Sequence, residues 1–373
     1  MTIGEQMRRA GGFTSGFDYM RLVLATMVVF NHSFGMGGGS MADLGLPFEF
    51  HRIFGHAILP MFFALSGFLV TASLLRTPNL GVFMGLRALR ILPALMVEIA
   101  LSALILGPLL TTVAWRDYFT DPDFFRYFLN MLGWIHYHLP GVFVDNPVPR
   151  IVNGSLWTVP YEAECYIVLA LIALLGLVRR PALFLGLLAL ACLALIVWSA
   201  AHGDPDPSRG TLTGRQLILF FLAGVLLHLG RDRVPSSGWL ALAAAGLSLA
   251  LVASHVWVYL LPLPVAYVTA WLGLQQPRKL PLLFTGDYSY GIYLYAYPIQ
   301  QAVVQMLPDG RVWYVNFAVS MVVVGCFAAF SWHCIEKPTL KLKRLLARRA
   351  GAQAPDTGAA SEAAPIAGQP AQA

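Results

Sequence analysis

The sequence predicts an all-α, polytopic membrane protein with about ten transmembrane helices and both termini in the cytoplasm. Three observations lead to this prediction. The 373 residues are 57% hydrophobic and only 12% charged, which is about half the charge of a soluble domain, and the mean hydropathy is +0.65. The apolar residues form separate runs of about the length that crosses a bilayer. Basic residues gather in alternate segments between those runs, as they do on the cytoplasmic side of membrane proteins.

Ten apolar runs follow one another along the chain. The expected spans are 17–36, 53–75, 91–113, 158–178, 182–200, 215–230, 238–254, 256–274, 283–306 and 312–333. With the N-terminus inside, the inner segments hold most of the 25 Lys and Arg residues, and this excess persists from loop to loop. Residues 1–345 therefore form the predicted transmembrane domain. Residues 346–373 are rich in Ala, Pro, Gly and Gln, which predicts a disordered cytoplasmic tail.

The remaining composition argues against several other classes of protein. The net charge of +6 is explained by the orientation of the helices, so no nucleic-acid partner is expected. The four cysteines lie in or beside apolar runs without paired spacing, which is not typical of a disulfide framework or a metal site. His136 and His138 lack an evident third ligand, so no metal is expected there either. They belong to the aromatic loop 114–157, which we expect to pack on the outer surface, partly as interfacial helix.

The first span carries charge in an apolar setting. Asp18, Arg21 and His32 lie within or beside the run LVLATMVVF, although such groups are unfavourable in hydrocarbon. Arg21 and His32 are eleven residues apart, which places them on one helix face about 16 Å from each other. That face would hold a cation near the cytoplasm and a proton-transfer group near the outer surface, with Asp18 orienting Arg21. The alternative is a packed helix whose histidine satisfies a neighbour.

Two further arginines are expected at the depth of Arg21. Arg87 and Arg90 are one helical turn apart at the inner end of the third span. Two guanidinium groups on one face form a candidate phosphate site. The alternative is that they only orient the helix.

Other polar residues lie inside the remaining spans. Glu162 is expected near the outer end of the fourth span, where it could pair with His32 or serve the helix N-terminus. Ser66 and Gly67 would allow close approach by a ligand or, as we favour, a neighbouring helix. Tyrosines, Tyr290 and Tyr293 among them, run deep into the ninth span and indicate a wall that faces a cavity.

Six segments together resemble the membrane acyltransferase-3 family. They are FDYMRLVLATMVVFNH, PMFFALSGFLVT, LRALRILPAL, SLWTVPYEAECY, YSYGIYLYAYPI and IEKPTLKL, in the family's order and almost from end to end of the chain. The resemblance implies a multi-pass protein of the bacterial inner membrane. Its expected reaction moves an acyl group, commonly acetyl, from cytoplasmic acyl-CoA to a sugar hydroxyl of an extracytoplasmic or lipid-linked glycan. Acyl-CoA would thus be a co-substrate, and no metal is implied.

The motifs and the resemblance together assign candidate site residues. The candidate catalytic residues are His32 and Glu162, the candidate donor-binding residues are Arg21, Arg87, Arg90 and Ser66, and the candidate acceptor-binding residues are Trp157, Tyr290 and Tyr293. His32 would act as general base or accept the acyl group first, and Glu162 would orient its ring. The chain departs from many family members in having Ala296 where they have a histidine, and in lacking a fused esterase-like domain after the last span.

Two functions of other classes stay open on the sequence. A transporter of acyl groups or glycan intermediates would use the intramembrane charges as its pathway, although the paired repeats common in transporters are not evident. An accessory subunit with an inactive site is the other alternative. The presence of both Arg21 and His32 argues against it.

Overall fold

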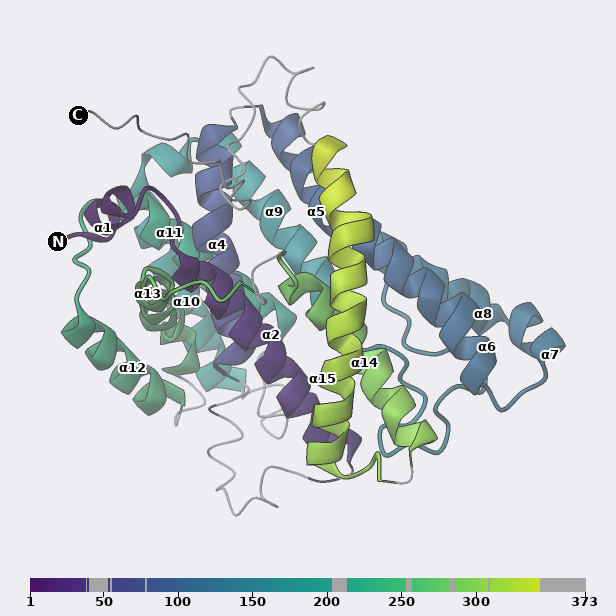
Figure 1. The fold of residues 1–373 in the computed structure, drawn as a ribbon. Coiled ribbons are helices and arrows are strands. Elements are labelled where there is room, and N and C mark those ends of the chain that lie inside the picture. The colour runs from purple at the N-terminus through teal and green to yellow at the C-terminus, as the bar shows by residue number, and fades with distance from the viewer. Residues whose placement is uncertain are drawn as a thin grey trace, which may run out of the picture.

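The computed structural model describes residues 1–37, 39, 53, 56–77, 79–202, 213–252, 257–281, 286–307 and 309–342. Within these residues the regular elements are helices, so the predicted all-α class is confirmed (Figure 1). The predicted tail, 346–373, lies outside the described residues.

Fourteen α-helices are described along the chain. They are α1 (Ile3–Arg9), α2 (Ser15–Met36), α4 (Ile58–Arg76), α5 (Leu80–Leu101), α6 (Gly107–Leu110), α7 (Trp115–Thr120), α8 (Pro122–Tyr127), α9 (Val159–Leu174), α10 (Pro181–His202), α11 (Gly214–Leu229), α12 (Gly238–Val252), α13 (Pro262–Gly273), α14 (Ser289–Met306) and α15 (Trp313–Phe330). A helix occupies most of each expected span.

Length and composition mark fewer helices as membrane-spanning than the sequence predicts. Among the described residues, five continuous helical stretches are long and apolar enough to cross a bilayer: Ile58–Arg76, Leu80–Leu110, Gly154–Leu174, Pro181–His202 and Trp313–Leu342. Two shorter apolar helices, α11 and α12, fall below that length. The predicted membrane protein is thus supported, whereas the count of about ten spans is not confirmed.

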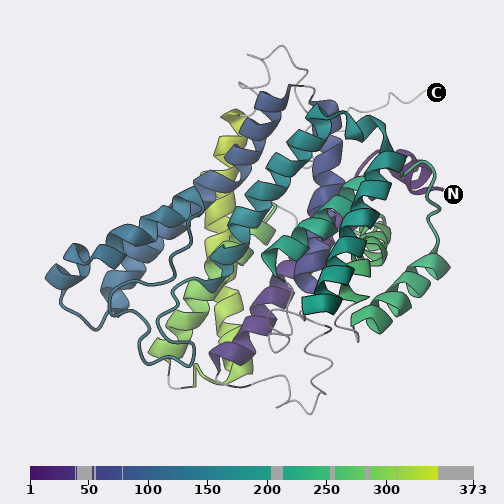
Figure 2. The ribbon, with the colours of Figure 1, turned by 180° about the vertical axis from the view of Figure 1, so that it is seen from behind.

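Helix α4 runs through the middle of the bundle and packs most extensively against α11 (Figures 1 and 2). A Cβ atom on Gly67 would collide with the carbonyl of Phe221, and one on Gly224 with the carbonyl of Ala64. Small residues at this crossing therefore let the two backbones touch. The predicted close approach at Gly67 is confirmed, and a neighbouring helix is what approaches.

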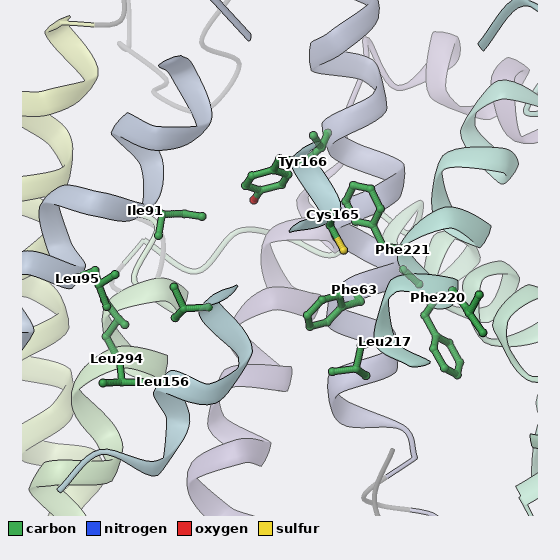
Figure 3. Close-up of a cluster of buried hydrophobic side chains, with 14 of the residues drawn as sticks. Phe63, Ile91, Leu95, Leu156, Cys165, Tyr166, Leu217, Phe220, Phe221 and Leu294 are labelled. Carbon is green, nitrogen blue, oxygen red and sulfur yellow. The ribbon is translucent and has the colours of Figure 1, made fainter. Parts of the chain in front are cut away.

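The same crossing leads into the hydrophobic core. Phe63 of α4, Cys165 of α9 and Phe221 of α11 lie close together there (Figure 3). On the other side of α4, helix α14 packs against both α2 and α15 (Figure 1). The helices α2, α4, α9 and α14 thereby become neighbours, although they are far apart in the sequence.

Loop 114–157 forms a compact layer beside the bundle. Its short helices α7 and α8 lie with α6 at one side of the molecule (Figures 1 and 2). The buried Tyr118 donates a hydrogen bond to the Ala103 carbonyl (2.7 Å), whereas Trp115 and Phe125 remain exposed. The aromatic residues thus fold the loop, as expected. The loop then ends in the 3₁₀ helix η4 (Gly154–Thr158), which leads directly into α9.

Candidate functional site

Two neighbouring cavities lie between the helices. One, of about 210 Å³, is lined by Arg21, Arg87, Arg90 and Glu162 among others; we call it the inner cavity, following the predicted orientation. The other, of about 740 Å³, is lined by His32 and Trp157 among others; we call it the outer cavity. The helices α2, α4, α9 and α14 contribute to both. The predicted donor-binding residues thus gather at one cavity and His32 lies at the next.

Charged side chains of the inner cavity form a network around one carboxylate. Asp287 accepts hydrogen bonds through its Oδ2 atom from Arg21 (2.8 Å) and Arg90 (2.7 Å). Arg90 also donates to Glu336 Oε2 (2.9 Å), and its guanidinium lies 5.6 Å from the Tyr290 ring centroid. Asp287 and Glu336 therefore offset much of the positive charge that the arginines bring to this cavity.

Arg87 differs from the other two arginines. Its Nη2 donates to Ser73 Oγ (3.2 Å), and its guanidinium lies 5.9 Å from the Phe83 ring centroid. No carboxylate contacts it within the described part of the chain, and its buried Nε has no hydrogen-bond partner there. Of the three arginines, Arg87 is the one with unused capacity to bind an anion.

Further polar groups complete the inner cavity. Tyr166 donates a hydrogen bond of 2.5 Å to Glu162, and Ser66 lies on the same wall. The Tyr290 hydroxyl donates to the carbonyl of Ile91 (2.9 Å), which fixes its ring beside Arg90. The apolar remainder of the lining includes Leu59 and Phe62, so the cavity is charged at one part of its wall and apolar elsewhere.

The outer cavity, by contrast, is lined by polar atoms that have no partners. Asn31 Oδ1, His32 Nδ1 and Ser155 Oγ are buried and lack hydrogen-bond partners among the described residues. The His32 ring meets the Tyr297 ring at a centroid distance of 5.1 Å, edge to face. Trp157 packs similarly against Tyr161 (6.1 Å). Buried polar atoms without partners are uncommon in folded proteins, and three around one cavity indicate a ligand site.

A series of hydrogen bonds positions the part of the outer-cavity wall that carries Ser155 and Trp157. Asn153 caps the N-terminus of η4 and donates to the Leu294 carbonyl (2.9 Å) and to Glu98 Oε1 (2.9 Å). Glu98 also accepts a hydrogen bond from Ser102 (2.8 Å). Ser102 is the first residue of a π-helical turn, Ser102–Leu106, and such turns are often found near functional sites. Glu98, without a role in the sequence analysis, thus anchors the segment that carries Trp157.

The structure does not bring His32 and Glu162 into one cavity. No hydrogen bond joins them in the described part of the chain, and Tyr166 is the partner of Glu162. The expected pairing of Asp18 with Arg21 is not observed either. Asp18 accepts a hydrogen bond from Lys279 (2.9 Å), and the carboxylate that pairs with Arg21 is Asp287. As for metals, no group of three His, Cys, Asp or Glu side chains suited to an ion occurs in the described ranges.

Sequence reasoning missed four residues that line these cavities or pair with their arginines. Asp287 lies just before α14, inside an expected span, so the rule that singled out Asp18 also applied to it. Glu336 stands in the closing Glu-Lys-Pro segment. Asn31 and Ser155 are uncharged, and nothing in the sequence distinguishes them from other polar residues.

Fold and site together define a helical membrane protein with two neighbouring cavities that are lined by polar as well as apolar side chains. The family model of an acyltransferase domain matches residues 14–332, so the chain belongs to the membrane acyltransferase-3 family and is an acyltransferase. It is 28% identical over 330 residues to an O-acetyl transferase of Shigella phage Sf6, covering 86% of this chain and 94% of that protein. It is 31% identical over 379 residues to nodulation protein 10 of Rhizobium leguminosarum bv. viciae, covering 93% and 99%. No solved structure matches the chain.

Proposed function

We propose that this acyltransferase works in the bacterial inner membrane and moves an acetyl group from cytoplasmic acetyl-CoA to a sugar hydroxyl of an extracytoplasmic or lipid-linked glycan. The single observation that supports this most is the pair of adjoining cavities, with arginines at one and His32 at the other. The phage relative is named an O-acetyl transferase, which favours acetyl as the acyl group.

The donor would bind at the inner cavity. Coenzyme A carries phosphates, and Arg87 has no carboxylate partner in the described residues. Arg21 and Arg90 are paired with Asp287 and Glu336, so Arg87 supplies most of the attraction for a phosphate. Arg21 and Arg90 hold the surrounding wall through Asp287. The pantetheine arm would run from there along α2, bringing the thioester towards His32.

The acceptor would bind at the outer cavity. Trp157 and Tyr293 offer aromatic faces to a sugar ring, and Asn31 and Ser155 offer polar atoms that lack partners among the described residues. A sugar hydroxyl placed against His32 loses its proton to the imidazole, and its oxygen attacks the thioester carbonyl. The carbon–sulfur bond breaks, and the imidazolium returns the proton to the thiolate. An ester and free coenzyme A result.

Two details of this mechanism stay open to test. In a two-step alternative, His32 first takes the acyl group from the thioester, and the sugar hydroxyl then takes it from His32. Glu162, which lies with the arginines in the inner cavity, would act on the donor side, because its bond to Tyr166 directs it away from a triad geometry. Slow release of coenzyme A by a Glu162→Gln variant, with unchanged acceptor affinity, would support that placement.

The decisive experiment compares cells with and without the protein. Mass spectrometry of their surface polysaccharide should show O-acetyl esters only when the protein is present, and purified protein should release coenzyme A from acetyl-CoA in the presence of that glycan. Transport of labelled substrate with no new ester bond would overturn the proposal in favour of a transporter.

A further inference from the structure

The inner and outer cavities meet at two side chains. Leu59 of α4 and Tyr293 of α14 are the residues that occur in the lining of both. A side chain that lines two neighbouring cavities stands on the boundary between them. A donor that extends from the arginines across this boundary towards His32 passes Leu59 and Tyr293.

The order of residues along α14 places this boundary between the two chemical groups. Tyr290 lines the inner cavity, Tyr293 lines both, and Tyr297 contacts the His32 ring. These three tyrosines are three and four residues apart, so they lie on one face of the helix in successive turns. Tyr293 is thus one turn from the arginine side and one turn from the histidine side.

Tyr293 is a fixed part of this boundary. Its hydroxyl donates to the Ser155 carbonyl (3.0 Å) and lies 2.6 Å from Thr158 Oγ1. Its ring also meets the edge of Phe62 at a centroid distance of 6.3 Å. The η4 segment that holds the hydroxyl is itself anchored through Asn153. The Tyr293 ring cannot move without breaking these hydrogen bonds, whereas the opposing side chain, Leu59, is aliphatic and has only packing to hold it.

We propose that Leu59 and Tyr293 set the length of the acyl group, restricting the enzyme to short chains such as acetyl. The inference rests on the proposed function, because it assumes that the thioester carbonyl lies at this boundary, within reach of an acceptor hydroxyl at His32. The acyl tail attached to that carbonyl is then flanked by Leu59, Phe62 and Tyr293, and each added methylene must displace packed side chains.

The outer cavity does not offer an alternative place for a longer tail. It must hold the acceptor at the moment of transfer. A hydrocarbon chain there would also offer no hydrogen-bond partner to Asn31 Oδ1, His32 Nδ1 and Ser155 Oγ, which are buried and lack partners in the described residues. The space beyond the boundary therefore favours a sugar over an alkyl chain.

Purified full-length protein tests this with acetyl-, butanoyl- and octanoyl-CoA as donors and alkali-deacylated surface polysaccharide as acceptor. Release of the free thiol gives kcat/KM for each donor. Wild-type protein should prefer acetyl-CoA. Leu59→Ala should raise kcat/KM for butanoyl-CoA relative to acetyl-CoA by about tenfold, the usual scale for a methylene-sized change in a pocket. Leu59→Phe should change the ratio in the opposite direction, which keeps the test valid if one variant folds poorly.

Leu75→Ala is the matched control, because Leu75 lies on the same helix, is exposed and lines neither cavity. It should keep the wild-type preference. An active enzyme whose preference is the same in wild-type, Leu59→Ala and Leu59→Phe protein overturns the inference but leaves the proposed function intact. Wild-type protein that releases no coenzyme A from any of the three donors overturns both.

Discussion

The two cavities differ in whether their polar groups have partners within the described part of the protein. In the inner cavity the charges of Arg21 and Arg90 are matched by Asp287. In the outer cavity, Asn31 and His32 each keep a buried polar atom without a partner in the described residues. An unpaired buried charge costs several kcal/mol, whereas an unsatisfied neutral group costs about 1–3 kcal/mol. The chain therefore pairs the charges within itself and can leave the neutral groups open.

This difference indicates separate roles: the paired charges stabilise the fold, whereas the unpaired polar groups are available to bind a substrate. The network around Asp287 ties α2, α5 and α14 to one another, so its first role is stability. The open atoms of the outer cavity lower stability, because an unsatisfied buried group costs free energy, and they gain partners when a ligand binds. Arg87 lines the inner cavity, but it resembles the unpaired groups of the outer cavity, because no carboxylate pairs with it in the described residues.

The largest expected effect is the loss of transfer in His32→Ala. A general base contributes about 10²- to 10⁴-fold to a rate, so kcat for acetyl transfer should fall by at least that range. The thermal midpoint should hardly change, because no hydrogen bond to His32 Nδ1 is lost. Thiol release and thermal unfolding of the purified protein measure both. His202→Ala, at an exposed helix end away from both cavities, is the control, and full activity of a folded His32→Ala protein would refute the assignment.

The next effect concerns the charge network and should appear in stability. Asp287→Asn keeps the shape but leaves Arg21 and Arg90 without their shared negative charge. Breaking a buried pair costs about 3–5 kcal/mol; these side chains are partly exposed, so we expect about 2–3 kcal/mol and a clearly lower thermal midpoint.

Asp232→Asn is the matched control for Asp287→Asn. Asp232 contacts Arg8 at 2.5 Å, but both side chains are more than half exposed. Such a pair contributes less than about 1 kcal/mol. The hydrogen bond from Arg8 lowers the pKa of Asp232, so this small contribution is present at neutral pH and is lost as the pH falls through the lowered pKa. Equal losses in the two variants would contradict a special role for Asp287.

Much of this arrangement can be predicted from the sequence, because the position of a residue within an apolar span indicates its depth in the membrane. Arg21, Arg87 and Arg90 were expected at one level from the ends of their spans, and all three line one cavity. Helix positions follow equally well, since each apolar run is bounded by polar segments. The crossing at Gly67 could also be expected, because only a residue without a side chain permits it.

What the sequence could not supply is the direction in which side chains point and the local geometry of helix ends. Glu162 was expected beside His32, but η4 begins at Gly154 and runs continuously into α9. The eight residue steps from Gly154 to Glu162 carry Glu162 about 12–16 Å along the axis, to the level of the arginines. Likewise, the carboxylate that pairs with Arg21 is Asp287, more than 260 positions away in the chain, and no local pattern links the two.

The smallest expected effect separates Arg87 from its neighbours. Arg87→Ala should weaken acetyl-CoA binding by about tenfold, the worth of one charge-assisted hydrogen bond to phosphate, while stability stays close to wild type because no carboxylate is left unpaired in the described residues. Arg90→Ala should lower both affinity and stability, since it removes one of the two arginines that pair with Asp287 and the ion pair with Glu336. Calorimetry of the purified proteins measures affinity, with Arg180→Ala, exposed and outside both cavities, as control. Unchanged affinity in Arg87→Ala would place the phosphate site elsewhere and remove Arg87 from the substrate-binding group.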